Sequence, residues 1–202
     1  MQELEESCVP SYLHPNPLAA GVAWWRLFAA VDMYKKLGRA GPVLDFGAGS
    51  GELRHLLGTG ATEYAFIEAD ERLAQRLEAT SGEVTREVLD SLPDGKFAAI
   101  FALDALEHNE DVGSIIDALS VGLRADGILV ISGPTENALY RLGRRIAGFS
   151  GHYHVQNIHQ IEAIAEGRLR RLDRRRVPFG VPLFSLSVWG RPGTSRAFRA
   201  SA

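Results

Sequence analysis

A glycine-rich segment flanked by acidic residues is the part of this sequence best suited to chemistry. It reads Asp45-Phe46-Gly47-Ala48-Gly49-Ser50-Gly51, and Glu68 follows the next apolar run. Glycines at alternate positions let the backbone turn sharply and approach a ligand, and the helix expected next offers its positive N-terminal end. A nicotinamide-binding loop would have the spacing GxGxxG, whereas Glu52 follows Gly51 here. Because Asp45 would repel a pyrophosphate, the segment favours a cationic ligand, and Glu68 could accept both hydroxyls of a ribose.

A second polar group, Asp104, Glu107 and His108, follows a strongly apolar run. Two carboxylates and an imidazole could bind a divalent ion. Alternatively, Asp104 faces the ligand while Glu107 and His108 hydrogen-bond the neighbouring backbone and cap the next helix. We prefer the second interpretation, so no metal site is predicted.

Three histidines are candidates for a general base, because imidazole titrates near neutral pH. They are His108, His152 and His154, the last two flanking Tyr153. The alternative for His152 and His154 is a packing or hydrogen-bonding role.

The elements that must position these residues alternate between apolar strands and amphipathic helices. A lead-in helix is expected over 17–37. Strands are expected over 42–46, 64–68, 83–89, 97–103 and 128–132, and helices over 51–57, 70–82, 109–127, 137–147 and 157–167. Asn109 and Asn157 are the expected N-caps of the helices that they begin. This alternation indicates an α/β, doubly wound fold with parallel strands joined by helical crossovers. The last two strands, 168–177 and 183–189, are predicted to form an antiparallel hairpin.

Three motifs together resemble class I S-adenosylmethionine-dependent methyltransferases. They are the segment 45–51 with Glu68, the stretch 92–108, and Arg124-Ala125-Asp126-Gly127 leading into an apolar strand. The resemblance covers roughly residues 40 to 190. It implies a Rossmann-like, seven-stranded, mainly parallel sheet with an antiparallel C-terminal hairpin and helices on both faces. We expect one methyltransferase domain over 1–202, with an arm and lid helix (1–38), a core (39–190) and a tail (191–202).

The resemblance also assigns roles to residues. S-adenosylmethionine would be the methyl donor. The loop under it would contain Gly47, Ala48, Gly49 and Gly51, Asp45 would face its amino group, and Glu68 would hold the ribose with Ala69 beside the adenine. The family's adenine-contacting aspartate has no clear counterpart, so Leu89, Asp90 and Ser91 are the candidates; Asp90 could equally cap a turn. Asp104 would lie beside the cofactor and, with His108, His152 and His154, is a candidate catalytic residue.

Two further segments resemble parts of this family. Asp104-x-x-Glu107-His108 is similar to the Glu-x-x-Glu-His of ubiquinone-pathway O-methyltransferases. The arm containing Tyr12 and His14, together with Trp24, Trp25 and Arg26, resembles a lead-in that often covers the cofactor. The predicted reaction is methyl transfer to a small-molecule acceptor by in-line displacement. The alternative is a non-catalytic S-adenosylmethionine-binding module that serves a partner protein.

Charge is unevenly distributed along the chain. Residues 1–140 have 10 basic and 22 acidic side chains, giving −12, and residues 141–202 have 12 arginines and 3 acidic side chains, giving +9. Arginine forks bind phosphate and carboxylate, so the acceptor could be phosphorylated, acidic or linked to a carrier. The arginines could instead form the solvated face of a strand. No nucleic-acid partner is expected, since the whole chain is acidic and no aromatics interleave the arginines.

Composition limits the cellular setting. The single cysteine, Cys8, excludes an internal disulfide and suits the cytoplasm. The most apolar stretch, Leu18 to Val31, is interrupted by Arg26 and is shorter than the roughly 20 residues of a membrane span. We therefore expect a soluble cytoplasmic protein with no transmembrane segment; the sequence carries no signal for an oligomeric state.

Overall fold

The computed structural model describes residues 12, 16–37, 40–58, 61–80, 82–137, 140, 155–178 and 182–194. Its centre is a seven-stranded sheet of order β3-β2-β1-β4-β5-β7-β6. The strands are β1 (Gly41–Phe46), β2 (Ala61–Ile67), β3 (Thr85–Arg86), β4 (Phe97–Leu103), β5 (Leu123–Pro134), β6 (Arg170–Val177) and β7 (Phe184–Gly190). Strands β1 to β5 run parallel, while β7 pairs antiparallel with β5 and β6. The Rossmann-like sheet and its C-terminal hairpin are confirmed.

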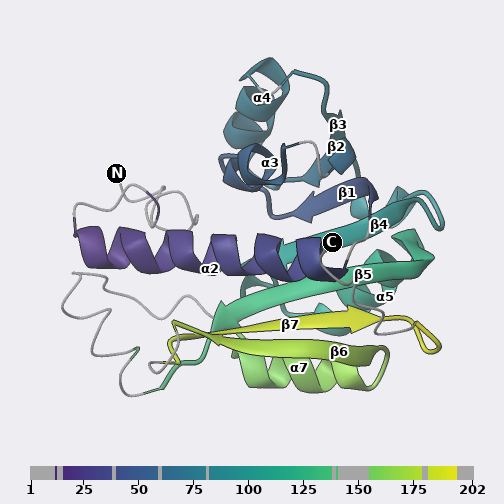
Figure 1. Cartoon of the computed structure of the whole chain (residues 1–202). Helices are drawn as coiled ribbons and strands as arrows, with labels where there is room; N and C mark the ends of the chain where they lie inside the picture. Colours follow the sequence, from purple (N-terminus) through teal and green to yellow (C-terminus); the bar gives the residue numbers. More distant parts are fainter. Residues whose placement is uncertain are drawn as a thin grey trace.

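Helices cover both faces of the sheet, as predicted. They are α2 (Pro17–Leu37), α3 (Glu52–Leu57), α4 (Glu71–Thr80), α5 (Val112–Gly122) and α7 (Ile158–Glu166), with short 3₁₀ turns η3 (Leu89–Ser91) and η4 (Leu106–His108). One buried cluster joins α2, α3 and α4 to the sheet, and a second joins α5 and α7 to it. Figure 1 shows α2 crossing one face of the sheet with α5 and α7 on the other side.

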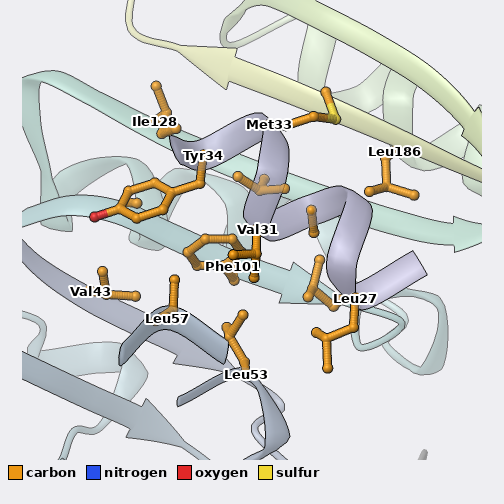
Figure 2. Packing of buried hydrophobic residues seen from close by; sticks show 14 of the residues in the cluster. Leu27, Val31, Met33, Tyr34, Val43, Leu53, Leu57, Phe101, Ile128 and Leu186 are labelled. Atoms are coloured by element: carbon orange, nitrogen blue, oxygen red, sulfur yellow. The ribbon is translucent and has the colours of Figure 1, made fainter. Parts of the chain in front are cut away.

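Helix α2 is fixed to the sheet by its apolar side. Leu27, Val31 and Tyr34 pack with Phe101 of β4, and the rings of Tyr34 and Phe101 lie 5.6 Å apart in an edge-to-face arrangement. Figure 2 shows these side chains filling the space between α2 and the strands. No helix in the described ranges is long and apolar enough to cross a bilayer.

The sheet contains a topological switch point between β1 and β4. From β1 the chain proceeds through β2 and β3 toward one edge, and from β4 through β5 toward the other. Ligands of open α/β sheets bind outside the carboxyl ends of the strands at such a point. Asp45, Glu68 and Asp104 lie at or just beyond the carboxyl ends of β1, β2 and β4.

Three local predictions were wrong. The strand expected over 83–89 pairs with β2 only at Thr85 and Arg86. Both side chains are exposed, so burial of apolar residues does not stabilise a longer strand here. The helix expected to end at Gly127 ends at Gly122, and β5 begins at Leu123, which is in register with Phe97. Asp111, and not Asn109, caps α5 by accepting a hydrogen bond from the backbone N–H of Ser114.

The capping prediction for the last helix was correct. Asn157 accepts hydrogen bonds from the N–H groups of His159 and Gln160, and the Gln160 side chain accepts one from the Asn157 N–H. This reciprocal arrangement satisfies donors that the first helical turn leaves unpaired. Most of the helix expected over 137–147 lies outside the described residues.

Candidate functional site

The glycine loop joins β1 to α3 at the switch point. Gly47, Gly49 and Gly51 have φ values of 75°, 57° and 84°, a region that side chains disfavour. A Cβ at Gly47 would lie only 2.5 Å from the Cβ of Ala105. The backbone N–H of Gly47 donates to the carbonyl of Ile67, which attaches the loop to β2. The sequence therefore needs glycine here for both the turn and the close packing.

Asp45 is a buried carboxyl group in this site. Its Oδ2 accepts a 2.6 Å hydrogen bond from the Tyr64 hydroxyl of β2. Burial raises the pKa of Asp45 to about 7; the Tyr64 hydrogen bond opposes this, and Glu68 and Glu52 add to it. A cationic ligand beside Asp45 would favour the ionised carboxylate.

Glu68 links the glycine loop to the start of α4. One carboxylate oxygen accepts from the Gly49 N–H at 2.7 Å, and the other accepts from the Asp70 N–H at 2.9 Å. Each oxygen has two lone pairs, so each can accept one further hydrogen bond. Glu68 is therefore oriented by the backbone and can still receive two hydroxyl groups.

A small cavity lies against the loop. Its walls include Asp45, Gly47, Gly49 and Glu52 on the loop side, and Tyr12, Leu27 and Leu103 on the other. Tyr12 comes from the arm and Leu27 from α2, so two segments preceding β1 help to enclose the cavity. The sequence suggested a covering role for this arm, and the structure places the Tyr12 ring at the cavity.

Asp104 is held in a defined orientation just beyond Leu103. It has a φ of 52°, unusual for a residue other than glycine. Its backbone N–H donates to the Ser132 carbonyl, and its Oδ1 accepts a 2.9 Å hydrogen bond from the Ser132 hydroxyl. Its Oδ2 pairs with the guanidinium of Arg26. The side chain of Asp104 is therefore fixed by two donors from two other elements.

Arg26 is the main residue of this site whose role the sequence did not reveal. It pairs with a residue 78 positions away, which no local pattern indicates. The available signal was its place on α2: Ala23 and Ala30, three residues before it and four after it, are buried. A charged residue within the buried stripe of a helix requires a partner.

Glu107 and His108 are neighbours in η4 but differ in burial. Glu107 is buried and its Oε2 has no hydrogen-bond partner among the described residues, whereas His108 is exposed. Burial, together with the nearby charge of Asp104, raises the pKa of Glu107 well above its usual value. In the described part of the chain, no three His, Cys, Asp or Glu side chains gather as metal ligands would. Neither residue caps α5, since Asp111 does.

Comparison with known proteins decides the family. A family model described as a methyltransferase domain matches residues 25–168, which include the loop, Glu68, Asp104 and Arg26. The chain belongs to this methyltransferase family. No curated protein matches the sequence significantly.

Solved structures share the fold of this methyltransferase at low sequence identity. N-methyltransferase NodS from Bradyrhizobium japonicum, in complex with S-adenosyl-L-homocysteine, has a TM-score of 0.71 at 18% identity, covering 95% of this chain and 97% of NodS. The PH0226 protein from Pyrococcus horikoshii OT3 has a TM-score of 0.72 at 14% identity, covering 95% and 99%. Magnesium protoporphyrin IX methyltransferase from Synechocystis PCC 6803, with bound S-adenosyl-L-homocysteine, has 0.64 at 18%, covering 88% of each chain.

The other predicted site residues of the methyltransferase lie around this centre or outside the described ranges. Ala69 follows Glu68 and is exposed. Leu89, Asp90 and Ser91 form η3; Leu89 packs against the second core cluster, while Asp90 and Ser91 are exposed. Their adenine contact stays a prediction. His14, His152 and His154 lie outside the described residues, as do Arg141, Arg144 and Arg145.

The arginines of β6 and its flanks pair with carboxylates of the methyltransferase itself. Arg174 binds Glu162 of α7 at 2.9 Å, and Arg175 binds Asp32 of α2 at 2.7 Å. Arg168 binds Asp117 at 2.9 Å and Arg171 binds Glu166 at 3.5 Å. These pairs attach the last strands to helices on both faces, so much of the basic C-terminal charge has a structural role.

Proposed function

We propose that this methyltransferase transfers a methyl group from S-adenosylmethionine to a small-molecule acceptor by in-line displacement. The observation that carries the proposal is the glycine loop with Asp45 and Glu68 at the switch point of a chain from this family. The likeness to NodS and to magnesium protoporphyrin IX methyltransferase, both with bound S-adenosyl-L-homocysteine, supports the choice of cofactor.

The residues of the site fit this cofactor. Asp45 is a buried carboxyl group at the cavity, where an ammonium group would stabilise its ionised form. Glu68 retains acceptor capacity for the two ribose hydroxyls. When bound, S-adenosylmethionine supplies an electrophilic methyl group on a sulfonium.

The chain itself contributes positioning and exclusion of water. Asp45 and Glu68 would bind opposite ends of the cofactor, while Tyr12 and Leu27 close one side of the cavity. Alignment of acceptor and methyl donor in an enclosed site can supply most of the acceleration. A base is needed only when the acceptor must lose a proton.

Asp104 is the base candidate best supported by geometry among the described residues. It follows the cavity residue Leu103 and is fixed by Ser132 and Arg26. We propose that it orients the acceptor and receives its proton. His108 is exposed on η4 and is the weaker candidate, and roles for His152 and His154 stay predictions.

The acceptor could be anionic or linked to a carrier, as the C-terminal charge suggests. Because several described arginines pair within the chain, this proposal depends on Arg141, Arg144 and Arg145. Replacing all three by glutamine should raise the KM for the acceptor and leave cofactor affinity unchanged. An unchanged KM would contradict an anionic acceptor.

Formation of S-adenosylhomocysteine tests the proposed reaction directly. The purified protein is incubated with S-adenosylmethionine and a panel of hydroxylated, amino-sugar and phosphorylated metabolites, and the product is quantified. One acceptor class should stimulate product formation. In Asp104→Asn the rate should fall by about 10²- to 10⁴-fold, the range for a general base, with cofactor affinity retained. Cofactor binding without transfer to any acceptor would favour the non-catalytic module instead.

A further inference from the structure

Arg26 lies where a charge is costly to bury. It comes from α2, its side chain is 2% exposed, and it pairs with Asp104, which is 10% exposed. Removing both charges from water offsets much of their attraction, so a buried pair adds little net stability. Leu27 and Leu103, which are next to Arg26 and Asp104 in the sequence, line the cavity, and this location points to a role in the site.

The guanidinium contacts three different segments. Nη1 pairs with Asp104 after β4, and Nη2 donates to the Tyr12 hydroxyl of the arm at 3.1 Å. Its Cζ lies 5.0 Å from the ring centroid of Phe184 on β7 and 5.9 Å from that of Tyr12. Arg26 is thus the common partner of the arm, the end of β4 and the C-terminal hairpin.

One of these partners is in the wall of the cavity, and another directly follows a residue of the wall. Tyr12 lines it directly, and Asp104 follows Leu103, which also lines it. Leu27, the residue next to Arg26, lines it as well. A movement of the Arg26 guanidinium would therefore release Tyr12 and Asp104 together.

We propose that Arg26 is a positioning residue that fastens Tyr12 against the cofactor cavity and fixes the carboxylate of Asp104. The inference rests on the proposed function, because the ligand retained would be S-adenosylmethionine or its product. Arg26 acts through its two partners and needs no contact with the ligand. Loss of the Arg26 guanidinium should speed release of the cofactor product and reduce turnover.

Release of S-adenosylhomocysteine can be followed by stopped-flow tryptophan fluorescence. Trp24 is a suitable reporter because its ring centroid lies 5.3 Å from that of Tyr12. In Arg26→Gln, release should be about threefold to tenfold faster, as expected when one or two hydrogen bonds are lost. Tyr12→Phe should also speed release. The two effects should be less than additive in the double variant, because both remove the same contact.

Two variants separate positioning from general support of α2. Arg175→Gln removes a different ion pair of this helix, with Asp32, and should leave the release rate unchanged. Arg26→Lys keeps a cation for Asp104 without the two-pronged fork. It should recover much of kcat while release stays fast, a split that a purely structural role would not produce.

The outcomes distinguish this inference from the proposed function. Equal release rates in Arg26→Lys, Tyr12→Phe and the unmodified protein would overturn the inference, as would fully additive effects in the double variant. Arg26→Lys and Tyr12→Phe keep the charge or the ring, so they test it even if Arg26→Gln does not fold. Failure of the unmodified protein to bind S-adenosylhomocysteine would overturn the proposed function and this inference with it.

Discussion

At the scale of single residues, the electrostatics of the site centre on Asp45. Its carboxyl group is buried, it receives the Tyr64 hydrogen bond, and two further acids lie nearby. With a pKa of about 7, Asp45 is partly protonated at neutral pH in the free protein. An ammonium group in contact with it would favour ionisation, so cofactor binding should release a proton.

The affinity for S-adenosylmethionine should therefore increase with pH. The ammonium lowers the pKa of Asp45 in the complex, so between that value and about 7 the affinity should rise by up to about tenfold per pH unit and then level off. Calorimetric titrations between pH 5.5 and 7.5 would measure this. In Asp45→Asn the affinity should be weaker and nearly independent of pH in this range.

Tyr64→Phe provides a second test of the same carboxyl group. The Tyr64 hydrogen bond lowers the pKa of Asp45, so its loss should move the levelling-off above pH 7. Tyr34→Phe is a matched control, because Tyr34 is a buried tyrosine that packs against Phe101 in the core. An identical pH profile in Tyr64→Phe and Tyr34→Phe would contradict the assigned role of Asp45.

Sequence reasoning was sufficient for some residues of the site and not for others. The glycines, Asp45 and Glu68 follow from local chemistry, since the turn needs positive φ and the acids come directly at strand ends. The partners Tyr64, Ser132 and Arg26 depend on which strands and helices are neighbours in space. No spacing in the sequence specifies those contacts.

At the scale of elements, the β1–α3 loop depends on its backbone conformation. Gly47→Ala would force a side chain into φ 75° and against the Cβ of Ala105. The left-handed conformation alone costs roughly 1–2 kcal/mol. We expect at least tenfold weaker binding of S-adenosylhomocysteine, measured by titration calorimetry.

Gly58→Ala is the control for this substitution. Gly58 also has a positive φ, 53°, but a Cβ there would meet nothing within 4 Å, and Gly58 follows the end of α3. Gly58→Ala should lower the melting temperature without weakening the binding of S-adenosylhomocysteine. Equal loss of affinity in both variants would show that general strain, and not the shape of the loop, determines binding.

The C-terminal hairpin is attached to α7 by a polar cluster of Glu162, Arg174 and Ser185. The Ser185 hydroxyl donates to Glu162 at 2.8 Å and accepts from Arg174 Nε at 3.1 Å, while Glu162 is only 5% exposed. Removal of one partner leaves a buried carboxylate without its counter-ion. This cluster therefore ties β6 and β7 to the helix behind them.

Arg174→Gln should lower the free energy of unfolding by about 1–3 kcal/mol, less than for a fully buried pair because Arg174 is partly exposed. Arg171→Gln, which removes a pair with the exposed Glu166, should cost less than about 1 kcal/mol. Urea unfolding of both variants would measure the difference. Equal losses would mean that the cluster has no special role.

The boundary between α5 and β5 shows that hydrophobic periodicity does not determine where an element ends. The apolar stripe of α5 continues to Leu123, which the sequence reasoning placed on the helix and the structure places in β5. An apolar residue fits the buried face of either element, so tertiary pairing with Phe97 decides. The long central strands were predictable because they are buried on both faces; the short edge strand β3 lacks that signal.

At the scale of the whole molecule, the charge asymmetry is partly a feature of assembly. Arg168, Arg175 and Arg191 from the basic end pair with Asp117, Asp32 and Asp94 from the acidic part. These contacts join the last strands to helices and turns that precede them in the chain. The acidic part also supplies Asp45 and Glu68, the carboxylates suited to a cationic cofactor.

Calorimetric titration of the unmodified protein with S-adenosylmethionine, S-adenosylhomocysteine and NAD tests the central claim most directly. Both sulfur compounds should bind with one site per chain, and NAD should give no signal, because Asp45 and Glu52 line the cavity where a pyrophosphate would lie. Tight binding of NAD with no response to either sulfur compound would contradict the account.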